Sequence, residues 1–320
     1  MHSRRAVTVP VVVVVEVAVL LTLPLSLVFA GVVAVATRST RPVRTVALVA
    51  AYAVIELRTL LRVARGDVEW EALAREVLGT GYGALRRILG VTVALEDGSA
   101  STAQLQASSG LVVLARHCGP GDSLFIAWLL MVHHGLALRI VLKHTLRWEP
   151  AVDLAGDHLP LCFVAPRRRR SRDDVARVAA GLRRGQALLL FPEGGNFSWQ
   201  RWREAIRRLT AAGAHHEARR ARGRTHTLPP RSGGAVAALA AAPDADVLLL
   251  AHSGLGADGR DRPWWRVPVN QQLVVRTLLL PAESVPREDE SARAFLDEAW
   301  SQVDTWVEGH ADLRTLRPER

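Results

Sequence analysis

The stretch VVLARHCGPGDSLFIAWLL, residues 112–130, decides the fold of this chain. It opens with an apolar run typical of a buried strand, passes through Gly-Pro-Gly, and continues as an apolar segment that favours a helix from about residue 123. A strand that leads through a tight turn into a helix is the repeating unit of α/β proteins. We expect Asp122 to be the N-cap of that helix.

The same alternation continues along the chain. Strands are predicted at 91–96, 111–116, 138–143, 161–165 and within 187–195, 245–254 and 271–281. Helices are predicted at 67–90, with a glycine-rich interruption at 79–83, and at 171–185, about 199–222 and 287–308. This pattern predicts an α/β fold with a mixed, largely parallel sheet flanked by helices. It would be preceded by an N-terminal membrane helix or helical hairpin.

The N-terminus favours membrane attachment. Residues 9–36 are almost uncharged, and about 20 apolar residues suffice to cross a bilayer. Glu16 is the only ionisable residue of this run, and Pro24 is expected to bend it. A second apolar run follows at 45–55, and arginines flank both ends, so a spanning hairpin and a monotopic re-entrant pair stay open. We expect the cell membrane as location, with the catalytic domain facing the cytoplasm.

Three regions are therefore expected along the chain. Residues 1–66 would form membrane-anchoring helices, 67–310 the α/β catalytic domain, and 311–320 a C-terminal tail.

The charge of the chain favours anionic partners. The formal net charge is +10, and Lys143 is the only lysine among 41 basic residues. Phospholipid head groups, phosphorylated substrates and nucleic acid would all suit this charge. The arginines of 201–224 have aromatic neighbours only at Trp199 and Trp202, which suit a membrane interface equally well. Together with the N-terminal run, this favours lipid and disfavours nucleic acid.

Candidate chemistry gathers at strand ends. His117 could act as a general base if Asp122 fixes its tautomer. FPEGG, residues 191–195, follows another buried strand, where a carboxylate and two glycines suit a polar-ligand site, although an ordinary turn also uses these residues. Arg231, in LPPRSGG, could bind an anion. Neither the histidines nor the two cysteines have the spacing of a metal site, so we expect no metal.

These motifs occur together in a known family. The H-x-x-x-x-D pattern of His117 and Asp122, FPEG about 70 residues later, and LPPR resemble the glycerolipid acyltransferases over residues 105–285. More narrowly, the chain resembles the 1-acylglycerol-3-phosphate (lysophosphatidate) acyltransferases. The resemblance implies transfer of a fatty acyl group from acyl-CoA or acyl carrier protein to a lysophospholipid hydroxyl. The expected process is phospholipid biosynthesis, and the expected cofactor is none.

The resemblance also implies residue roles. His117 would deprotonate the acceptor hydroxyl, and Asp122 would orient His117. Glu193 and Gly194 would shape the acceptor pocket. The candidate contacts to the acceptor phosphate are Arg167 and Arg231, and Lys143 stands where the family's middle block begins.

The chain departs from the family pattern at one block. F-P-E-G-T-R is usual there, whereas Gly195 and Asn196 occupy the last two places here. An amide can hydrogen-bond phosphate but brings no charge, so Arg201 or Arg203 could substitute. A different lipid or glycolipid acceptor, an esterase, and a catalytically silent lipid-binding protein stay open as alternatives. The acyl-chain length, the carrier of the thioester and the oligomeric state stay open as well.

Overall fold

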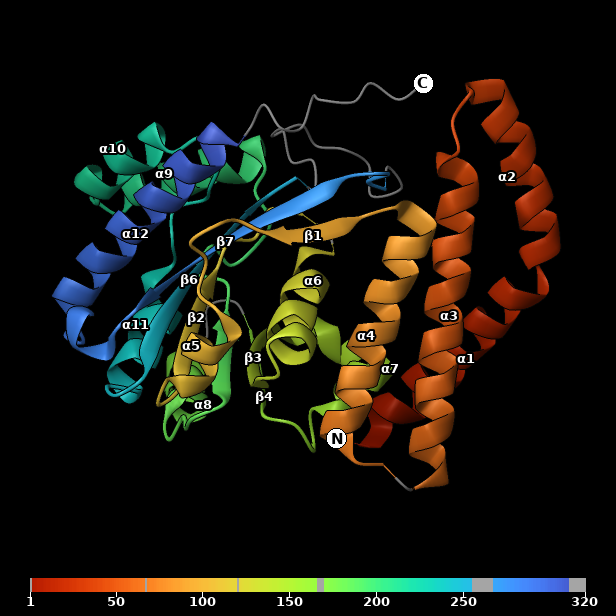
Figure 1. The fold of residues 1–320 in the computed structure, drawn as a ribbon, viewed down its shortest axis with the longest axis horizontal. Coiled ribbons are helices and arrows are strands. Elements are labelled where there is room, and N and C mark those ends of the chain that lie inside the picture. The colour runs from red at the N-terminus through yellow and green to blue at the C-terminus, as the bar shows by residue number, and fades with distance from the viewer. Residues whose placement is uncertain (1, 67, 120, 166–169, 255–266, 311–320) are drawn as a thin grey trace.

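One mixed sheet organises the protein (Figure 1). The computed structural model describes residues 2–66, 68–119, 121–165, 170–254 and 267–310. The sheet has seven strands in the order β1-β7-β6-β2-β5-β3-β4. Among the described strands, only β6 and β7 pair antiparallel, which confirms the predicted α/β class with a largely parallel sheet. The strands are β1 (Thr92–Leu95), β2 (Leu111–Ala115), β3 (Ala137–Lys143), β4 (Leu161–Val164), β5 (Gln186–Leu190), β6 (Asp246–Ser253) and β7 (Gln272–Leu280).

Helices cover both faces of this sheet. Alternate residues of β2 show this, because Val113 belongs to one apolar core and Val112 to the other. A strand buried on both faces reads as a continuous apolar run, which is why β2 was recognisable in the sequence. The helices after the N-terminal segment are α4 (Trp70–Leu89), α5 (Thr102–Ala107), α6 (Asp122–Trp128), α7 (Pro150–Ala155), α8 (Arg170–Ala179), α9 (Trp199–Ala211), α10 (His215–Gly223), α11 (Ser232–Ala241) and α12 (Asp289–Gly309). A π turn (Leu129–His133) and 3-10 turns (His144–Trp148 and Ala282–Ser284) complete the described elements.

Two helix predictions need correction. The glycines of 79–83 do not interrupt α4, which is continuous from Trp70 to Leu89. A β-carbon at Gly81 would stand 3.4 Å from the Leu124 side chain, so this glycine lies where α4 packs closely on α6. The helix predicted at 199–222 is two helices, because Gly213 adopts a φ of +77° between α9 and α10.

The N-terminal segment forms three helices at one end of the molecule (Figure 1). They are α1 (His2–Leu21), α2 (Leu23–Thr37) and α3 (Arg41–Arg65). The axis bends by 60° between α1 and α2, and Pro24 lies in the first turn of α2. Among the described residues, no single helix has the length and apolar character for a membrane crossing, whereas the bent α1–α2 pair meets both criteria.

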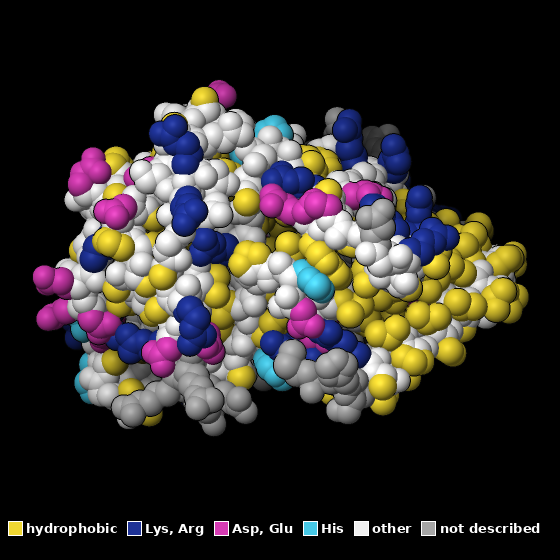
Figure 2. Space-filling view, turned by 90° about the horizontal axis from the view of Figure 1, so that it is seen from below, with side chains coloured by type: hydrophobic (Ala, Val, Ile, Leu, Met, Phe, Trp, Pro, Cys, Tyr) yellow, Lys and Arg dark blue, Asp and Glu magenta, His cyan; other side chains and the backbone are white. Residues whose placement is uncertain are grey.

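The outer surface of this segment is apolar. Space-filling atoms at that end of the molecule are largely hydrophobic (Figure 2). The exposed side chains include Val14, Leu21, Leu25, Phe29 and Val35, each more than half exposed. An apolar patch of this kind marks a membrane or protein contact.

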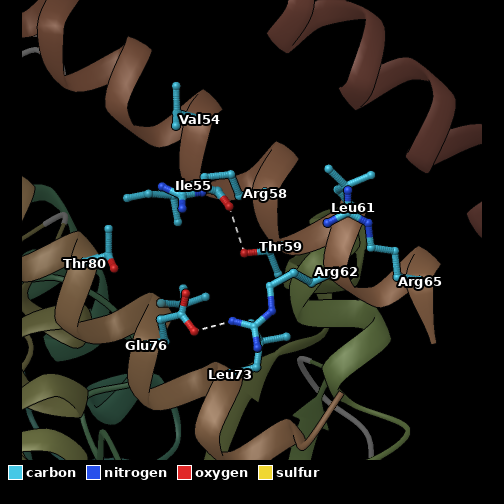
Figure 3. Close-up of a pocket in the computed structure, with 11 residues that line it drawn as sticks. Val54, Ile55, Arg58, Thr59, Leu61, Arg62, Arg65, Leu73, Glu76 and Thr80 are labelled. Carbon is cyan, nitrogen blue, oxygen red and sulfur yellow. Dashed lines mark hydrogen bonds and ion pairs between the residues drawn. The ribbon is translucent and has the colours of Figure 1, made fainter. Parts of the chain in front are cut away.

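The segment is also fixed to the sheet domain. Arg4 and Arg5 form ion pairs of 2.6 and 2.8 Å with the buried carboxylate of Asp153 on α7. A pocket of about 220 Å³ lies between α3 and α4, and the Arg62–Glu76 ion pair crosses it (Figure 3). None of the candidate catalytic or substrate-binding residues lines this pocket.

Candidate functional site

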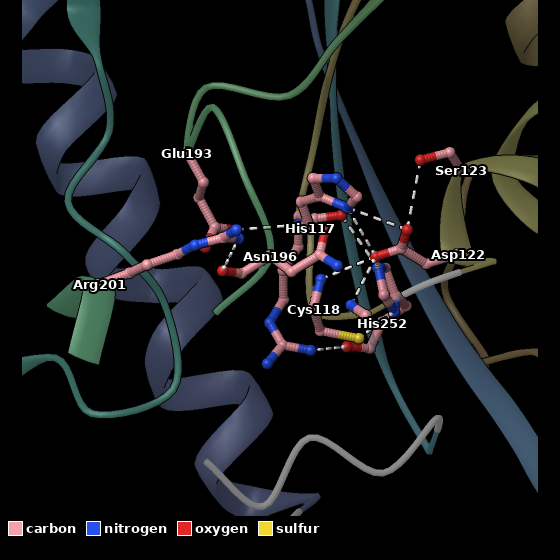
Figure 4. A network of polar contacts seen from close by, with 10 residues as sticks. His117, Cys118, Asp122, Ser123, Glu193, Asn196, Arg201 and His252 are labelled. Carbon is pink, nitrogen blue, oxygen red and sulfur yellow. Dashed lines mark hydrogen bonds and ion pairs between the residues drawn. The ribbon is translucent and has the colours of Figure 1, made fainter. Parts of the chain in front are cut away.

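His117 and Asp122 meet at the carboxyl end of β2 (Figure 4). The His117 Nδ1 atom lies 2.9 Å from each carboxylate oxygen of Asp122. The Asp122 side chain is fully buried, whereas 14% of the His117 side chain is exposed. Because Nδ1 faces the carboxylate, Nε2 is the ring nitrogen available to an incoming hydroxyl.

The Asp122 carboxylate is held by the loop that precedes it. Its Oδ2 atom accepts hydrogen bonds from the backbone N–H groups of Cys118 (2.7 Å) and Gly119 (3.1 Å). Burial alone would raise the pKa of Asp122, but the hydrogen bond and charge of His117 hold that pKa below its usual range. The carboxylate therefore stays ionised and can stabilise a positive charge on the imidazole.

Asp122 is not the helix N-cap that the sequence predicted. It is the first residue of α6, and Gly121, with a φ of +92°, occupies the cap position. The side chain turns back toward the loop because the buried N–H groups and His117 lie on that side.

A second histidine, His252, lies close to the His117–Asp122 pair. His252 on β6 is fully buried, and its Nε2 atom donates a 2.9 Å hydrogen bond to the carbonyl of Arg116. The same nitrogen lies 3.7 Å from Asp122 Oδ2, and Nδ1 lies 3.7 Å from the Cys118 sulfur. Burial lowers the pKa of His252 to about 4, so the ring is neutral. Sequence reasoning missed this residue, although a histidine within the apolar run LLLAHS was its signal.

Cys118, Asp122 and His252 place potential metal-ligand atoms within 4.8 Å of one another. Asp122 Oδ2 already accepts two backbone N–H groups, and His252 Nε2 already donates to a carbonyl. A metal ion would have to break these bonds, so the hydrogen-bonded arrangement accounts for the group better. The Cys118 thiol is buried and directed at His252, so it is not accessible as a nucleophile.

Glu193 fixes the backbone beneath His117. It is 1% exposed, and its two oxygens accept hydrogen bonds from the backbone N–H groups of His117 (2.9 Å) and Leu228 (2.8 Å). Burial raises the pKa of Glu193 to about 7, opposed by the charge of Arg116 and by these two bonds. The Glu193 carboxylate thus faces the backbone. Any effect of Glu193 on an acceptor would be indirect, through the loops of His117 and Leu228 that it joins.

Three cations surround the glycine loop after β5. A β-carbon at Gly194 would stand 3.0 Å from the Arg231 side chain, and one at Gly195 would stand 3.2 Å from the Arg201 guanidinium and 3.7 Å from Lys143 Nζ. Arg201 also donates to the backbone carbonyl of Asn196 at 3.1 Å. Burial, Arg201 and Arg231 all lower the pKa of Lys143, which reflects how closely the positive charges lie.

Gly195 explains how Arg201 reaches this loop. A threonine there would place its β-carbon in a tighter contact with Arg201 than side chains normally make. Arg201 of α9 thus lies against the loop at positions 195 and 196. Arg203 lies elsewhere, in the groove between α9 and α10, and Arg167 lies outside the described residues.

The fold and the site together define an α/β protein with a hydrogen-bonded histidine–aspartate pair and, near it, a glycine loop bordered by three cations. Residues 100–250 match the family model described as Acyltransferase.

One solved structure has a similar fold. The crystal structure of the 1-acyl-sn-glycerophosphate (LPA) acyltransferase PlsC from Thermotoga maritima is 17% identical in sequence. It matches with a TM-score of 0.50 over 83% of this chain and 89% of that chain, a likeness that shows a common fold. No curated protein sequence matches the chain.

The neutral state of His252 makes a prediction about acid stability. The pKa of His252 is about 4 in the folded protein and about 6.5 when unfolded. At pH values between these two pKa values, His252 is protonated in the unfolded chain but neutral in the folded protein. The free energy of unfolding therefore falls as the pH falls, by on the order of 2–3 kcal/mol at pH 4.5. His252→Gln removes this titration and keeps an amide donor for the Arg116 carbonyl. Its unfolding free energy should therefore decline less than that of the wild type between pH 7 and 4.5.

Urea unfolding in detergent at several pH values measures this difference. His144→Gln, a change at an exposed histidine, serves as the control and should follow the wild type. Parallel pH curves for His252→Gln and the wild type would contradict a neutral, buried His252.

Proposed function

We propose that this protein transfers a fatty acyl group from an acyl thioester to a hydroxyl of a lysophospholipid. The expected acceptor is 1-acylglycerol-3-phosphate. The observation that carries the proposal is the buried Asp122 carboxylate bonded to His117 Nδ1, with Nε2 left for the acceptor. The match of residues 100–250 to the acyltransferase family model supports the reaction class.

The reaction needs one base and no covalent intermediate. His117 Nε2 removes the proton of the acceptor hydroxyl as its oxygen attacks the thioester carbonyl carbon. The carbon–sulfur bond then breaks, and the departing thiolate takes the proton from the imidazolium. Asp122 stabilises the imidazolium during this step.

The three cations beside the loop suit the phosphate of the acceptor. Arg231 and Arg201 can bind phosphate oxygens in pairs, and Lys143 adds a third charge. The Asn196 amide adds a donor without charge. We propose that this cluster, rather than an arginine at position 196, binds the anionic head group.

Membrane attachment through residues 1–66 completes the proposal. The exposed apolar surface of α1 and α2 would enter the lipid, and the sheet domain would work at the cytoplasmic face of the cell membrane. A lipid acceptor would then reach the site without leaving the bilayer surface.

The catalytic pair is tested by two substitutions. His117→Ala should abolish acyl transfer because it removes the partly exposed imidazole that is hydrogen-bonded to Asp122. Asp122→Asn should lower kcat by about 10²- to 10⁴-fold, since the base loses its orienting charge. Transfer of labelled acyl groups to lysophosphatidate, measured on purified folded variants, gives both values.

His144→Ala is the matched control and should retain full activity, because His144 is exposed and lies outside the pair. Near-normal turnover in both His117→Ala and Asp122→Asn would rule out the general-base mechanism.

The cation cluster is tested by its preference for charge. One charge-assisted contact to phosphate contributes roughly 1.5–3 kcal/mol, which corresponds to about 10- to 150-fold in affinity. Arg231→Ala and Arg201→Gln should each lower kcat/KM for a phosphorylated lysolipid by that order. Both should change turnover of an uncharged monoacylglycerol little. A wild-type preference for the uncharged acceptor, or equal losses with both acceptors, would exclude lysophosphatidate and leave acyl transfer intact.

The membrane assignment is tested by extraction. Apolar burial does not weaken with ionic strength, whereas surface charge attraction does. The full-length protein should therefore stay with the membrane fraction after washing with 1 M salt or alkaline carbonate. Release by salt alone would mean that the arginines, and not α1 and α2, hold it there.

A further inference from the structure

A second basic site lies between α9 and α10. A groove of about 460 Å³ is lined by Trp202, Arg203, Ile206, Arg207 and Arg222. Trp202 and Ile206 are one turn apart on α9 and form an apolar floor, while Arg203 and Arg207 are one turn apart beside them. The Trp202 indole N–H donates to the carbonyls of Ala221 (3.1 Å) and Arg224 (2.6 Å), so the floor is fixed to both helices.

The arginines of this groove, Arg203, Arg207 and Arg222, form no ion pair with any carboxylate that the structure describes. The arginines on the other side of α10 differ, because Arg220 and Arg224 both pair with Asp297 of α12. Placing like charges one turn apart costs stability. The groove therefore lacks the negative charge that an anionic ligand would supply.

The groove lies close to the glycine loop that follows β5. The Phe197 N–H donates to the His117 carbonyl (3.1 Å), and α9 begins two residues later, at Trp199. Arg201 of its first turn reaches the loop carbonyl of Asn196, and Trp202 of the groove is the next residue. A long ligand could thus occupy the groove at one end and His117 at the other.

The position of the groove argues against a lipid head group. The α9 and α10 helices lie at the end of the molecule opposite α2 and α3 (Figure 1). The exposed apolar side chains gather on α1 and α2. A bilayer contacted by those helices would lie far from the groove, so the expected anion comes from the aqueous side.

We propose that the α9–α10 groove binds the phosphorylated adenine nucleotide of an acyl-CoA donor. The groove is of small-ligand size and combines an indole with three guanidinium groups from two helices. Arginine suits phosphate, and an aromatic floor suits a nucleotide base or ribose. This inference rests on the proposed acyl transfer and identifies the donor, whose extended arm would carry the thioester to His117.

Binding can be measured without catalysis. Adenosine 3′,5′-bisphosphate, the nucleotide portion without thioester, is titrated calorimetrically into the full-length protein in detergent. The double variant Arg207→Gln/Arg222→Gln should bind it at least about 10-fold more weakly, because charge-assisted contacts are lost. Arg219→Gln, which removes an exposed arginine of α10 outside the groove, should bind as the wild type does. Wild-type affinity in the double variant, or no binding by the wild type, would overturn the proposal.

Kinetics then separate donor recognition from the chemistry. The double variant should raise KM for acyl-CoA by about 10-fold or more and leave KM for acyl-pantetheine, which has no nucleotide, at the wild-type value. Equal losses with both donors would contradict a nucleotide site. A loss confined to acyl carrier protein as donor would assign the groove to an acidic protein, and binding only to anionic vesicles would assign it to lipid; both would overturn the inference. Absence of transfer with every donor, alongside retained nucleotide binding, would refute the proposed function alone.

Discussion

The buried negative charge of Asp122 constrains the whole site. An ionised carboxylate without solvent is costly unless hydrogen bonds and a positive partner compensate it. Two backbone N–H groups and the His117 imidazole meet that need. The turn after β2 must therefore fold back over the carboxylate, and Gly121, with its positive φ, allows the reversal. The hydrogen bond between Asp122 and His117 that helps to compensate this charge also orients the imidazole.

Two further buried carboxylates hold the loops around that pair. Glu193 joins the His117 backbone to that of Leu228, across the ends of two separate loops. Asp304 of α12 accepts bonds from the backbone of Thr225 and His226 and from the Thr227 hydroxyl. Loops at the edge of a sheet have no ladder bonds of their own, so side chains must satisfy their N–H groups. These side-chain acceptors keep the loops in register with His117.

Sequence reasoning reached the fold because its signals are local. The apolar run of β2 and the turn at 119–121 predict the strand and helix without any tertiary information. The pairing of His117 with Asp122 was also accessible, since both lie on one short turn. The support from His252 was not, because β6 approaches β2 only once the sheet forms. Likewise, the approach of Arg201 to the loop after β5 depends on the space that Gly195 leaves in the folded chain.

The apolar surface and the unpaired arginines of the α9–α10 groove lie at opposite ends of the molecule. Exposed apolar side chains gather on α1 and α2, whereas the arginines without acidic partners on α9 and α10 lie at the other end. The cations Lys143, Arg201 and Arg231 lie beside the glycine loop after β5, next to the start of α9. In the proposed acyl transfer, an amphiphilic acceptor and a water-soluble donor would be most easily accommodated if they entered from opposite sides, because neither would then cross the other's binding surface. A sheet that ends in several loops at one edge can combine two such approaches at a single histidine, since each loop carries its own side chains to the common strand end.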